Sequence, residues 1–279
     1  MADAVSPASP PPETPPPTPE AHHPPESSGG SSVFSLPLAS LSPADPLRWL
    51  KLGWADFLRC PRIGLFYGLC FFAMGHALLA VFRQAPEYVL ALSAGFLLMG
   101  PFLCLGLYDA SRAMQTQSHR PSLRASLRAW QPTKGTMAIF AGVLLILEML
   151  WGRAALVVFA VSFNTMPGKA NLLAMLLDPE NLGFLITYTV VGAVFAGLIF
   201  VTSAISIPMI MDRRVDAISA GLTSIRACLL NPGVMLLWGA LITGIIVLAM
   251  LPAFLGLLIA GPVIGHATWH AYKSVVAPD

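Results

Sequence analysis

Five long runs of apolar residues constrain this chain more than any other feature. They cover about residues 62–82, 88–110, 136–163, 183–211 and 233–272. An α-helix needs about 20 predominantly apolar residues to cross the hydrocarbon core of a bilayer, which is about 30 Å thick. Each of the first four runs therefore predicts one membrane-spanning helix.

The fifth run is too long for a single crossing. As one helix, residues 233–272 would extend about 60 Å, about twice the hydrocarbon thickness. Pro252 lies near the middle of the run, and a proline can end one helix and open the next. The sequence therefore predicts an all-α polytopic membrane protein with about six transmembrane helices. Their predicted bounds are 62–82, 88–110, 136–161, 183–211, 233–251 and 253–272.

Composition agrees with a protein surrounded by lipid. The chain is 56% hydrophobic and 11% charged, whereas soluble domains carry about 25% charged residues. The formal net charge is only +2, and the basic residues lie between apolar runs instead of forming one face. We therefore expect membrane lipid as a partner and do not expect nucleic acid.

The N-terminal segment differs in composition from the rest. Residues 1–45 contain twelve prolines together with many serines and threonines. Such a segment cannot bury enough apolar surface to offset the entropy of an ordered chain. We expect a disordered, proline-rich tail over residues 1–45 and an integral membrane domain over residues 46–276.

Lysine and arginine are distributed unequally between the two predicted sides. Loops that stay in the cytoplasm carry the excess of these residues. Three of the sixteen, Arg83, Arg153 and Lys169, fall on the side predicted to be external. The other thirteen fall on the opposite side, which includes both ends of the membrane domain. This asymmetry predicts that the N-terminus and the C-terminus are both cytoplasmic.

A short amphipathic segment precedes each predicted pair of spans, at about residues 47–57, 123–130 and 215–229. Their apolar stripes and basic opposite faces suit helices that lie on the cytoplasmic leaflet. The first and third units also share a proline followed seven residues later by a glycine, Pro61 with Gly68 and Pro232 with Gly239. The sequence thus suggests three repeats of an interfacial amphipathic helix plus a transmembrane hairpin.

Glu148 is the acidic residue deepest in a predicted span. It lies about 18 Å along the third span at helical rise, where an ionised carboxylate is costly and commonly functional. We interpret it either as a proton or cation site on a polar cavity, or as a hydrogen-bonded structural acid. Arg153 is not spaced for an intrahelical ion pair with Glu148, and its expected role is an anchor at the outer interface.

Two histidines near the C-terminus share one helix face. His266 and His270 stand four residues apart, a spacing that can serve one metal ion if further ligands are present. Haem ligation is also open, with His76 as another imidazole. The alternative is that both histidines lie in the cytoplasmic interfacial belt with Trp269 and Tyr272. No metal site or cofactor is assigned from these residues.

Asp212 and Arg213 close the fourth predicted span. They could contact a substrate headgroup, or they could fix the depth of the helix end, which is the usual role of mixed charge there. The sequence contains no P-loop, nucleophile elbow or dinucleotide-binding glycine pattern. We therefore assign no catalytic residue.

Three motifs resemble a known family. They are Ile207-Pro208-Met209-Ile210-Met211-Asp212-Arg213-Arg214-Val215-Asp216-Ala217, Gly100-Pro101-Phe102 running to Ser111-Arg112, and Gly265-His266-Ala267-Thr268-Trp269-His270-Ala271-Tyr272. With them the chain resembles the domain of unknown function 2189 family (DUF2189), over about residues 46–276. The last motif is the most specific. The resemblance implies a multi-span protein of the bacterial cytoplasmic membrane and brings no established activity.

Three functional hypotheses follow. The first is a non-enzymatic membrane protein that acts in transport or membrane organisation, alone, as a homo-oligomer or with other membrane proteins. The second is a haem- or metal-binding membrane protein that uses His266 and His270. The third is a lipid-modifying membrane enzyme with Asp212 and the histidines as acid or base.

Overall fold

The computed structural model describes residues 37–84, 89–116, 121–162 and 178–276. These residues are almost entirely helical, with one isolated bridge between Leu38 and Val276. Most of the predicted tail lies outside the described residues. Its last part packs on the body, because Ala39 N donates to Val275 O (2.9 Å) and Leu41 N donates to Asn231 Oδ1 (2.9 Å).

Six long helices and four shorter ones make up the described chain, apart from two 3-10 turns. The long helices are α2 (Pro61–Gln84), α3 (Val89–Thr116), α5 (Lys134–Ser162), α7 (Leu182–Ser203), α10 (Pro232–Met250) and α11 (Leu257–Val275). The shorter ones are α1 (Asp45–Arg59), α4 (Leu123–Ser126), α8 (Ser206–Arg213) and α9 (Ala217–Leu230). The turns are Gln131–Thr133 and Pro179–Asn181.

Four segments in the described residues are long and apolar enough to cross a membrane. They are Pro61–Val81, Leu123–Ser162, Leu182–Arg213 and Pro232–Met250. Large apolar side chains cover their outer surfaces, including Val161 and Leu236, which are 84% and 76% exposed. Such surfaces suit lipid contact, and they confirm a helical membrane protein with several spans.

The remaining two predicted spans, residues 88–110 and 253–272, correspond to α3 and α11 and are not among these four. The second half of α11 carries His266, His270 and Lys273 and is largely enclosed by protein. Its polarity separates it from the lipid-facing helices. The prediction of six spans is therefore not confirmed by helix length and composition.

The long fifth run is divided as predicted. Helix α10 ends at Met250 and α11 begins at Leu257, with Pro252 in the turn between them. Ala253 and Phe254 have φ values of 49° and 66°, which L-residues with a side chain seldom adopt because Cβ crowds the carbonyl. This turn reverses the chain and returns α11 alongside α2.

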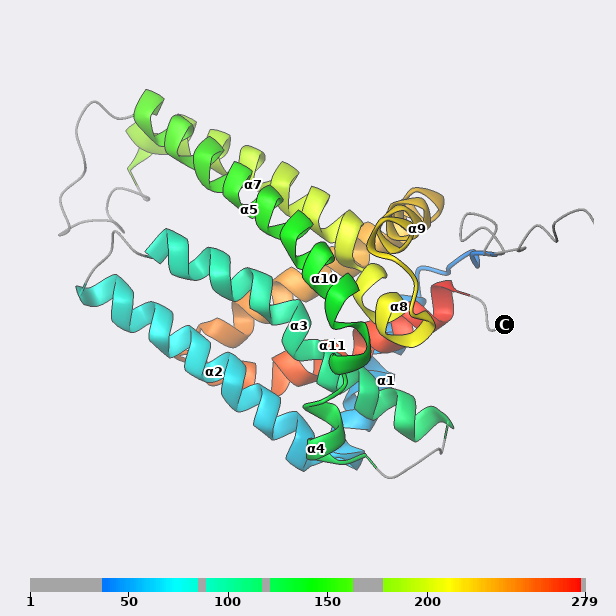
Figure 1. Ribbon diagram of the computed structural model, residues 1–279. Helices are drawn as coiled ribbons and strands as arrows, with labels where there is room; N and C mark the ends of the chain where they lie inside the picture. Colours follow the sequence, from blue (N-terminus) through cyan, green and yellow to red (C-terminus); the bar gives the residue numbers. More distant parts are fainter. Residues whose placement is uncertain (1–36, 85–88, 117–120, 163–177, 277–279) are drawn as a thin grey trace, which may run out of the picture.

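Helix α11 lies at the centre of one half of the molecule, packed between α1, α2 and α3 (Figure 1). Glycines permit the close approach of these helices. A Cβ on Gly53 of α1 would lie 2.6 Å from Val263 O, and a Cβ on Gly68 of α2 would collide with Leu258 O. The backbones of α1 and α2 therefore contact the backbone of α11 directly.

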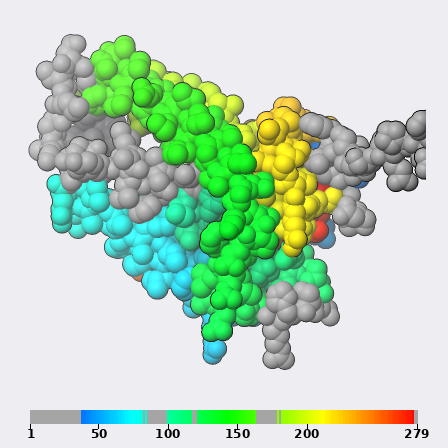
Figure 2. All heavy atoms as spheres, in the orientation of Figure 1, coloured from blue at the N-terminus to red at the C-terminus, as the bar shows by residue number. Residues whose placement is uncertain are grey.

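Helices α5 and α7 lie side by side in the other half (Figure 1). In the space-filling view, α5 forms a continuous ridge over the face of the molecule turned to the viewer (Figure 2). The fourth apolar run is broken where α7 ends at Ser203 and α8 begins at Ser206. Ile205 N donates to Ser224 Oγ (3.2 Å) at this break, so the predicted span 183–211 is not one straight helix.

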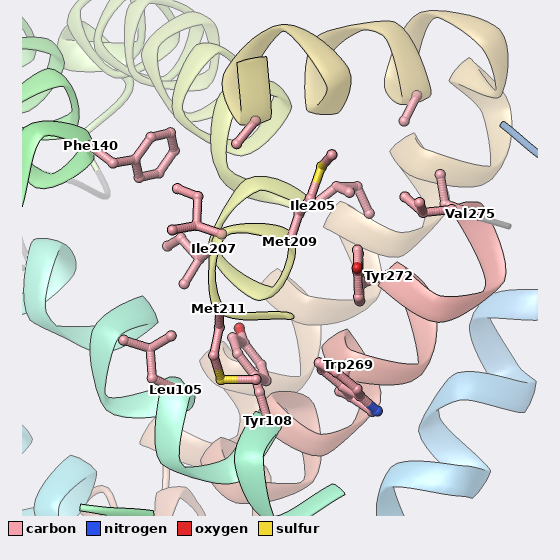
Figure 3. Packing of buried hydrophobic residues seen from close by; sticks show 14 of the residues in the cluster. Leu105, Tyr108, Phe140, Ile205, Ile207, Met209, Met211, Trp269, Tyr272 and Val275 are labelled. Atoms are coloured by element: carbon pink, nitrogen blue, oxygen red, sulfur yellow. The ribbon is translucent and has the colours of Figure 1, made fainter. Parts of the chain in front are cut away.

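The main core surrounds α8. Ile205, Ile207, Met209 and Met211 are buried against Phe140 and against residues of α3 and α11, including Leu105, Tyr108, Trp269 and Tyr272 (Figure 3). This core contains much of the apolar motif at residues 207–211. Protein, and not lipid, therefore surrounds that motif.

The short helices α1 and α9 present apolar residues outward. On α1, Leu47 and Trp54 are exposed, whereas Trp49 and Phe57 are buried. On α9, Ile218 and Leu229 are exposed, while small residues such as Ala220 and Ala227 pack inward. Both helices therefore have a protein-facing side and an apolar outer side, a pattern typical of helices at a membrane interface.

Candidate functional site

A cavity of about 440 Å³ lies between α3, α5 and α7. Pro101 comes from α3, Glu148 and Trp151 from α5, and Ala196 and Phe200 from α7. The small residues of α7 leave room on that side, while the aromatic rings make the walls largely apolar. Glu148 is the only acidic residue in the lining, and its side chain is buried.

The Glu148 carboxylate has no hydrogen bond or ion pair with any residue in the described part of the chain. Arg153 does not neutralise it, because Arg153 is exposed on another part of α5 and does not line the cavity. The structure therefore separates the two residues. A carboxylate in such a position can hold a proton, accept hydrogen bonds from a ligand, or pair with a bound cation.

A second group of polar residues connects α1, α3 and α11. Asp56 Oδ2 lies 2.8 Å from His270 Nε2 and accepts a hydrogen bond from Ser111 Oγ, also at 2.8 Å. Ser111 Oγ lies 2.7 Å from His266 Nδ1. All four side chains are buried. We call Asp56, Ser111, His266 and His270 the buried histidine network.

The hydrogen-bond pattern assigns the protons of the first histidine. Ser111 has one hydroxyl proton, and it is donated to Asp56, so Ser111 Oγ accepts from a protonated Nδ1 of His266. The other ring nitrogen, Nε2, lies 3.8 Å from the Cys60 thiol. Both nitrogens of His266 therefore contact protein atoms, although the single Cys60 thiol proton can serve either Nε2 or Asp56 O, which lies 3.2 Å from the sulfur.

The second histidine is held in the same way. Its Nε2 donates to Asp56, and its Nδ1 lies 3.1 Å from the side-chain amide nitrogen of Gln115, which donates to it. Gln115 Oε1 in turn accepts from Trp269 Nε1 (2.9 Å). Both ring nitrogens of His270 thus have hydrogen-bond partners within the protein.

Electrostatics keep Asp56 ionised and Cys60 neutral. Burial raises the pKa of Asp56, but the hydrogen bonds from His270 and Ser111 and the electrostatic interaction with the two histidines outweigh it, so the pKa lies below its ordinary value of 3.8. Burial and the nearby Asp56 charge raise the pKa of Cys60 to about 11. The network is therefore centred on a carboxylate, with a thiol at one end.

The third histidine of the metal hypothesis lies elsewhere. His76 Nδ1 is 3.2 Å from Phe72 O, and its ring contacts those of Phe72 and Phe254. No group of three His, Cys, Asp or Glu side chains in the described ranges is arranged to hold a metal ion. The interfacial-belt alternative expected His266 and His270 at the surface. Both side chains are instead buried inside the protein.

Asp212 links the end of α8 to α11. Its Oδ2 accepts hydrogen bonds from Tyr272 OH (2.9 Å) and Lys273 Nζ (3.3 Å). Arg213 follows as the last residue of α8 and is half-buried. Asp212 is thus engaged in holding two elements together, and it does not approach the histidine network.

Sequence reasoning did not identify Asp56, Ser111 or Cys60. A signal was present for Asp56: with Trp49 and Gly53 it stands at positions i, i+4 and i+7 of one helix face. A carboxylate on the same face as a tryptophan and a glycine indicates a buried partner. Ser111 and Cys60 carried no comparable signal.

Comparison with known protein families matches residues 89–212 of this chain to a family described as a predicted integral membrane protein. The family model is that of DUF2189, and the matched residues, called here the DUF2189 segment, make up less than half of the chain. This confirms the family resemblance, although the matched segment is shorter than residues 46–276. No curated protein and no solved structure matches the chain.

The DUF2189 segment runs from the start of α3 to Asp212 in α8. It therefore includes the whole lining of the Glu148 cavity and contributes Ser111 to the histidine network. Asp56, His266 and His270 lie outside it, as does the closing motif at residues 265–272. The Glu148 cavity therefore lies entirely within the matched segment, whereas the buried histidine network lies only partly within it.

Proposed function

We propose that this DUF2189 protein is a non-enzymatic membrane protein that binds and carries a hydrophobic cation in the Glu148 cavity. The observation that carries the proposal is a buried carboxylate without a partner in the described residues, on the wall of an intramembrane cavity. A positively charged ligand would supply the missing partner.

The size and lining of the cavity suit an organic ligand. Its volume of about 440 Å³ falls within the range of about 300–1,000 Å³ for small-molecule sites. Trp151, Phe195 and Phe200 line it, and aromatic faces attract organic cations. A mostly apolar body with one positive charge therefore fits better than a small hydrated ion, whose water the walls could not replace.

Glu148 also provides a means of coupling to protons. An ionised, unpaired carboxylate is costly inside a bilayer, so the empty cavity favours a proton on Glu148. A bound cation favours the ionised form instead, and the proton leaves as the cation enters. One site that holds either a proton or a cation can exchange the two across a membrane.

For the membrane arrangement we infer six crossings, by α2, α3, α5, α7, α10 and α11, with both termini in the cytoplasm of a bacterium. One short helix precedes α2 and α3, and one precedes α5 and α7, whereas two short helices, α8 and α9, precede α10 and α11. Short helices before each pair of long ones support three repeated units. Helix α3 has 28 residues, or about 42 Å at helical rise. That length is sufficient for a tilted crossing.

The metal and enzyme hypotheses rank lower. The ring nitrogens of His266 and His270 already contact protein groups, and a metal would have to displace these partners. Asp212 pairs with Tyr272 and Lys273, so it is poorly placed as an acid or base for lipid chemistry.

Binding of radiolabelled tetraphenylphosphonium to purified protein in lipid nanodiscs tests the proposal. We expect Glu148→Gln to weaken binding about tenfold or more, equivalent to about 1.4 kcal/mol, because the counter-charge is removed. Glu148→Asp keeps the charge and should retain part of the affinity. Binding to the native protein should release protons, which a pH-sensitive dye detects in weak buffer.

A matched pair of alanines on α7 provides the control. Ala196 lines the cavity, whereas Ala193 is exposed outside it. Ala196→Phe should reduce binding by filling the cavity, and Ala193→Phe should leave binding unchanged. Equal binding by native protein and Glu148→Gln, or equal loss from both phenylalanine variants, would contradict the proposal.

A further inference from the structure

A second cavity, of about 580 Å³, lies where α1 ends and α2 begins. Arg59, Cys60, Pro61 and Arg62 from this junction line it, and Pro121 closes another side. This cavity is separate from the Glu148 cavity, because the two share no lining residue. We call it the junction cavity.

The charge of the junction cavity is positive. It contains two arginines and no acidic residue in its lining. Arg62 has no ion pair within the described ranges, and it stands in the first turn of the 24-residue helix α2, where the helix dipole adds positive potential. Arg59 Nη1 lies 4.0 Å from Asp56 Oδ1, which is a long distance for an ion pair, and the Arg59 side chain is largely exposed.

The position of the junction cavity places it at headgroup depth. The candidate span of α2 begins at Pro61, which is itself a lining residue. Arg62, Leu65 and Leu69 stand at positions i, i+3 and i+7, so they share one stripe of α2. Leu65 and Leu69 are about half exposed and continue from the arginine toward the middle of the span.

We propose that the junction cavity binds the phosphate group of an anionic membrane phospholipid, with Arg59 and Arg62 as its ligands and an acyl chain along Leu65 and Leu69. Arginine guanidinium groups match phosphate oxygens in geometry and charge. The apolar stripe beneath them distinguishes a lipid from a free anion, which would gain nothing from it. Cys60 also lines the cavity, and its thiol donates to Asp56 O (3.2 Å), so it is not counted as a ligand.

The cavity also adjoins the buried histidine network. The buried Asp56 carboxylate lies 4.0 Å from the exposed Arg59 guanidinium and accepts hydrogen bonds from His270 and Ser111. An anion that draws Arg59 outward therefore leaves Asp56 with these partners and does not unfold the network. The site can accordingly fill and empty without rearranging α1 and α11.

Lipid binding to the detergent-purified full chain, measured by native mass spectrometry, tests this proposal. The titrants are phosphatidylglycerol and phosphatidylcholine with identical acyl chains. We expect phosphatidylglycerol to bind more tightly, and Arg62→Gln to weaken it about fivefold, the typical contribution of one basic residue at an anionic surface. Arg59→Gln should have a similar effect, and both variants should bind phosphatidylcholine as the native protein does.

Arg128→Gln is the matched control, because Arg128 is an exposed basic residue outside the junction cavity. It removes the same charge and should leave phosphatidylglycerol binding unchanged. Unaltered binding by Arg62→Gln, or an equal loss from Arg128→Gln, would overturn the site. Displacement of phosphatidylglycerol by millimolar inorganic phosphate would overturn the choice of lipid over free anion.

Discussion

Asp56 belongs to α1, yet it accepts hydrogen bonds from Ser111 of α3 and His270 of α11. An unpaired charge in the interior is costly, and these donors offset that cost. The same bonds fix the orientation of the histidine rings, so a single carboxylate joins three helices that are far apart in the sequence. At the scale of single residues, the described structure depends on such satisfied polar contacts as well as on apolar packing.

Replacing Asp56 tests this role. We expect Asp56→Asn to destabilise the protein by about 3 kcal/mol, because it leaves the histidine network without its central charge. Asp109→Asn is the control, since Asp109 is also buried but has one ion pair, to Arg112 at 3.4 Å. Its expected effect is smaller. Thermal unfolding of the purified proteins in detergent provides the comparison.

The pH dependence of the same comparison has a defined sign. The pKa of Asp56 in the folded protein is below 3.8, so its contribution to stability is present above that ordinary value and is lost as pH falls through the lower folded value. The stability difference between native protein and Asp56→Asn should be constant from pH 7 to about pH 5 and shrink below about pH 4. A difference that grows on acidification would rule out this account.

At the scale of elements, glycines determine how closely α1 and α2 approach α11. Gly53 and Gly68 each face the α11 backbone, where a methyl group finds no space. Backbone atoms cannot move aside as a flexible side chain can, so the interface depends on the absence of Cβ. The glycine at residue 68, which sequence analysis noted only as part of a repeat, thus has a packing function.

Gly68→Ala should separate α2 from α11 and cost about 1–3 kcal/mol, the usual range for an overpacked interior. The matched control is Gly142→Ala in α5, where a Cβ would meet nothing within 4 Å. That substitution should be neutral or slightly stabilising, since alanine favours the helix by about 0.5–1 kcal/mol. Unfolding temperatures that change equally in the two variants would show that the contact with Leu258 has no effect.

At the scale of the whole molecule, the described helices form two unlike halves. Helices α5 and α7 form a pair with broad apolar outer surfaces, whereas α11 is enclosed by α1, α2 and α3 (Figure 1). The Glu148 cavity lies beside the first pair, and the buried histidine network lies within the second group. The cavity proposed to bind a ligand thus lies in a different half from the hydrogen-bonded network.

The proposed topology predicts the location of reporters. Alkaline phosphatase fused after the C-terminus, or before the N-terminus, should be inactive in bacterial cells. The proposed topology puts both ends, with thirteen of the sixteen lysines and arginines, on the cytoplasmic side. A fusion within residues 163–177 should be active, and fluorescent-protein fusions should show the opposite pattern. Activity at one end only would mean an odd number of crossings.

Hydropathy along the chain was sufficient to predict the helical membrane class, four of the spans, the division at Pro252 and the acidic residue Glu148 within a span. The length of an apolar run and the free-energy cost of a charged residue inside a bilayer are local properties, which follow from short stretches of sequence. Packing in three dimensions was needed to show that α11 is enclosed by protein, that α8 turns into the core, and that Asp56 contacts Ser111 and His270. Asp56 and His270 are 214 positions apart, and no local pattern fixes which helix faces meet when several neighbours offer apolar surfaces.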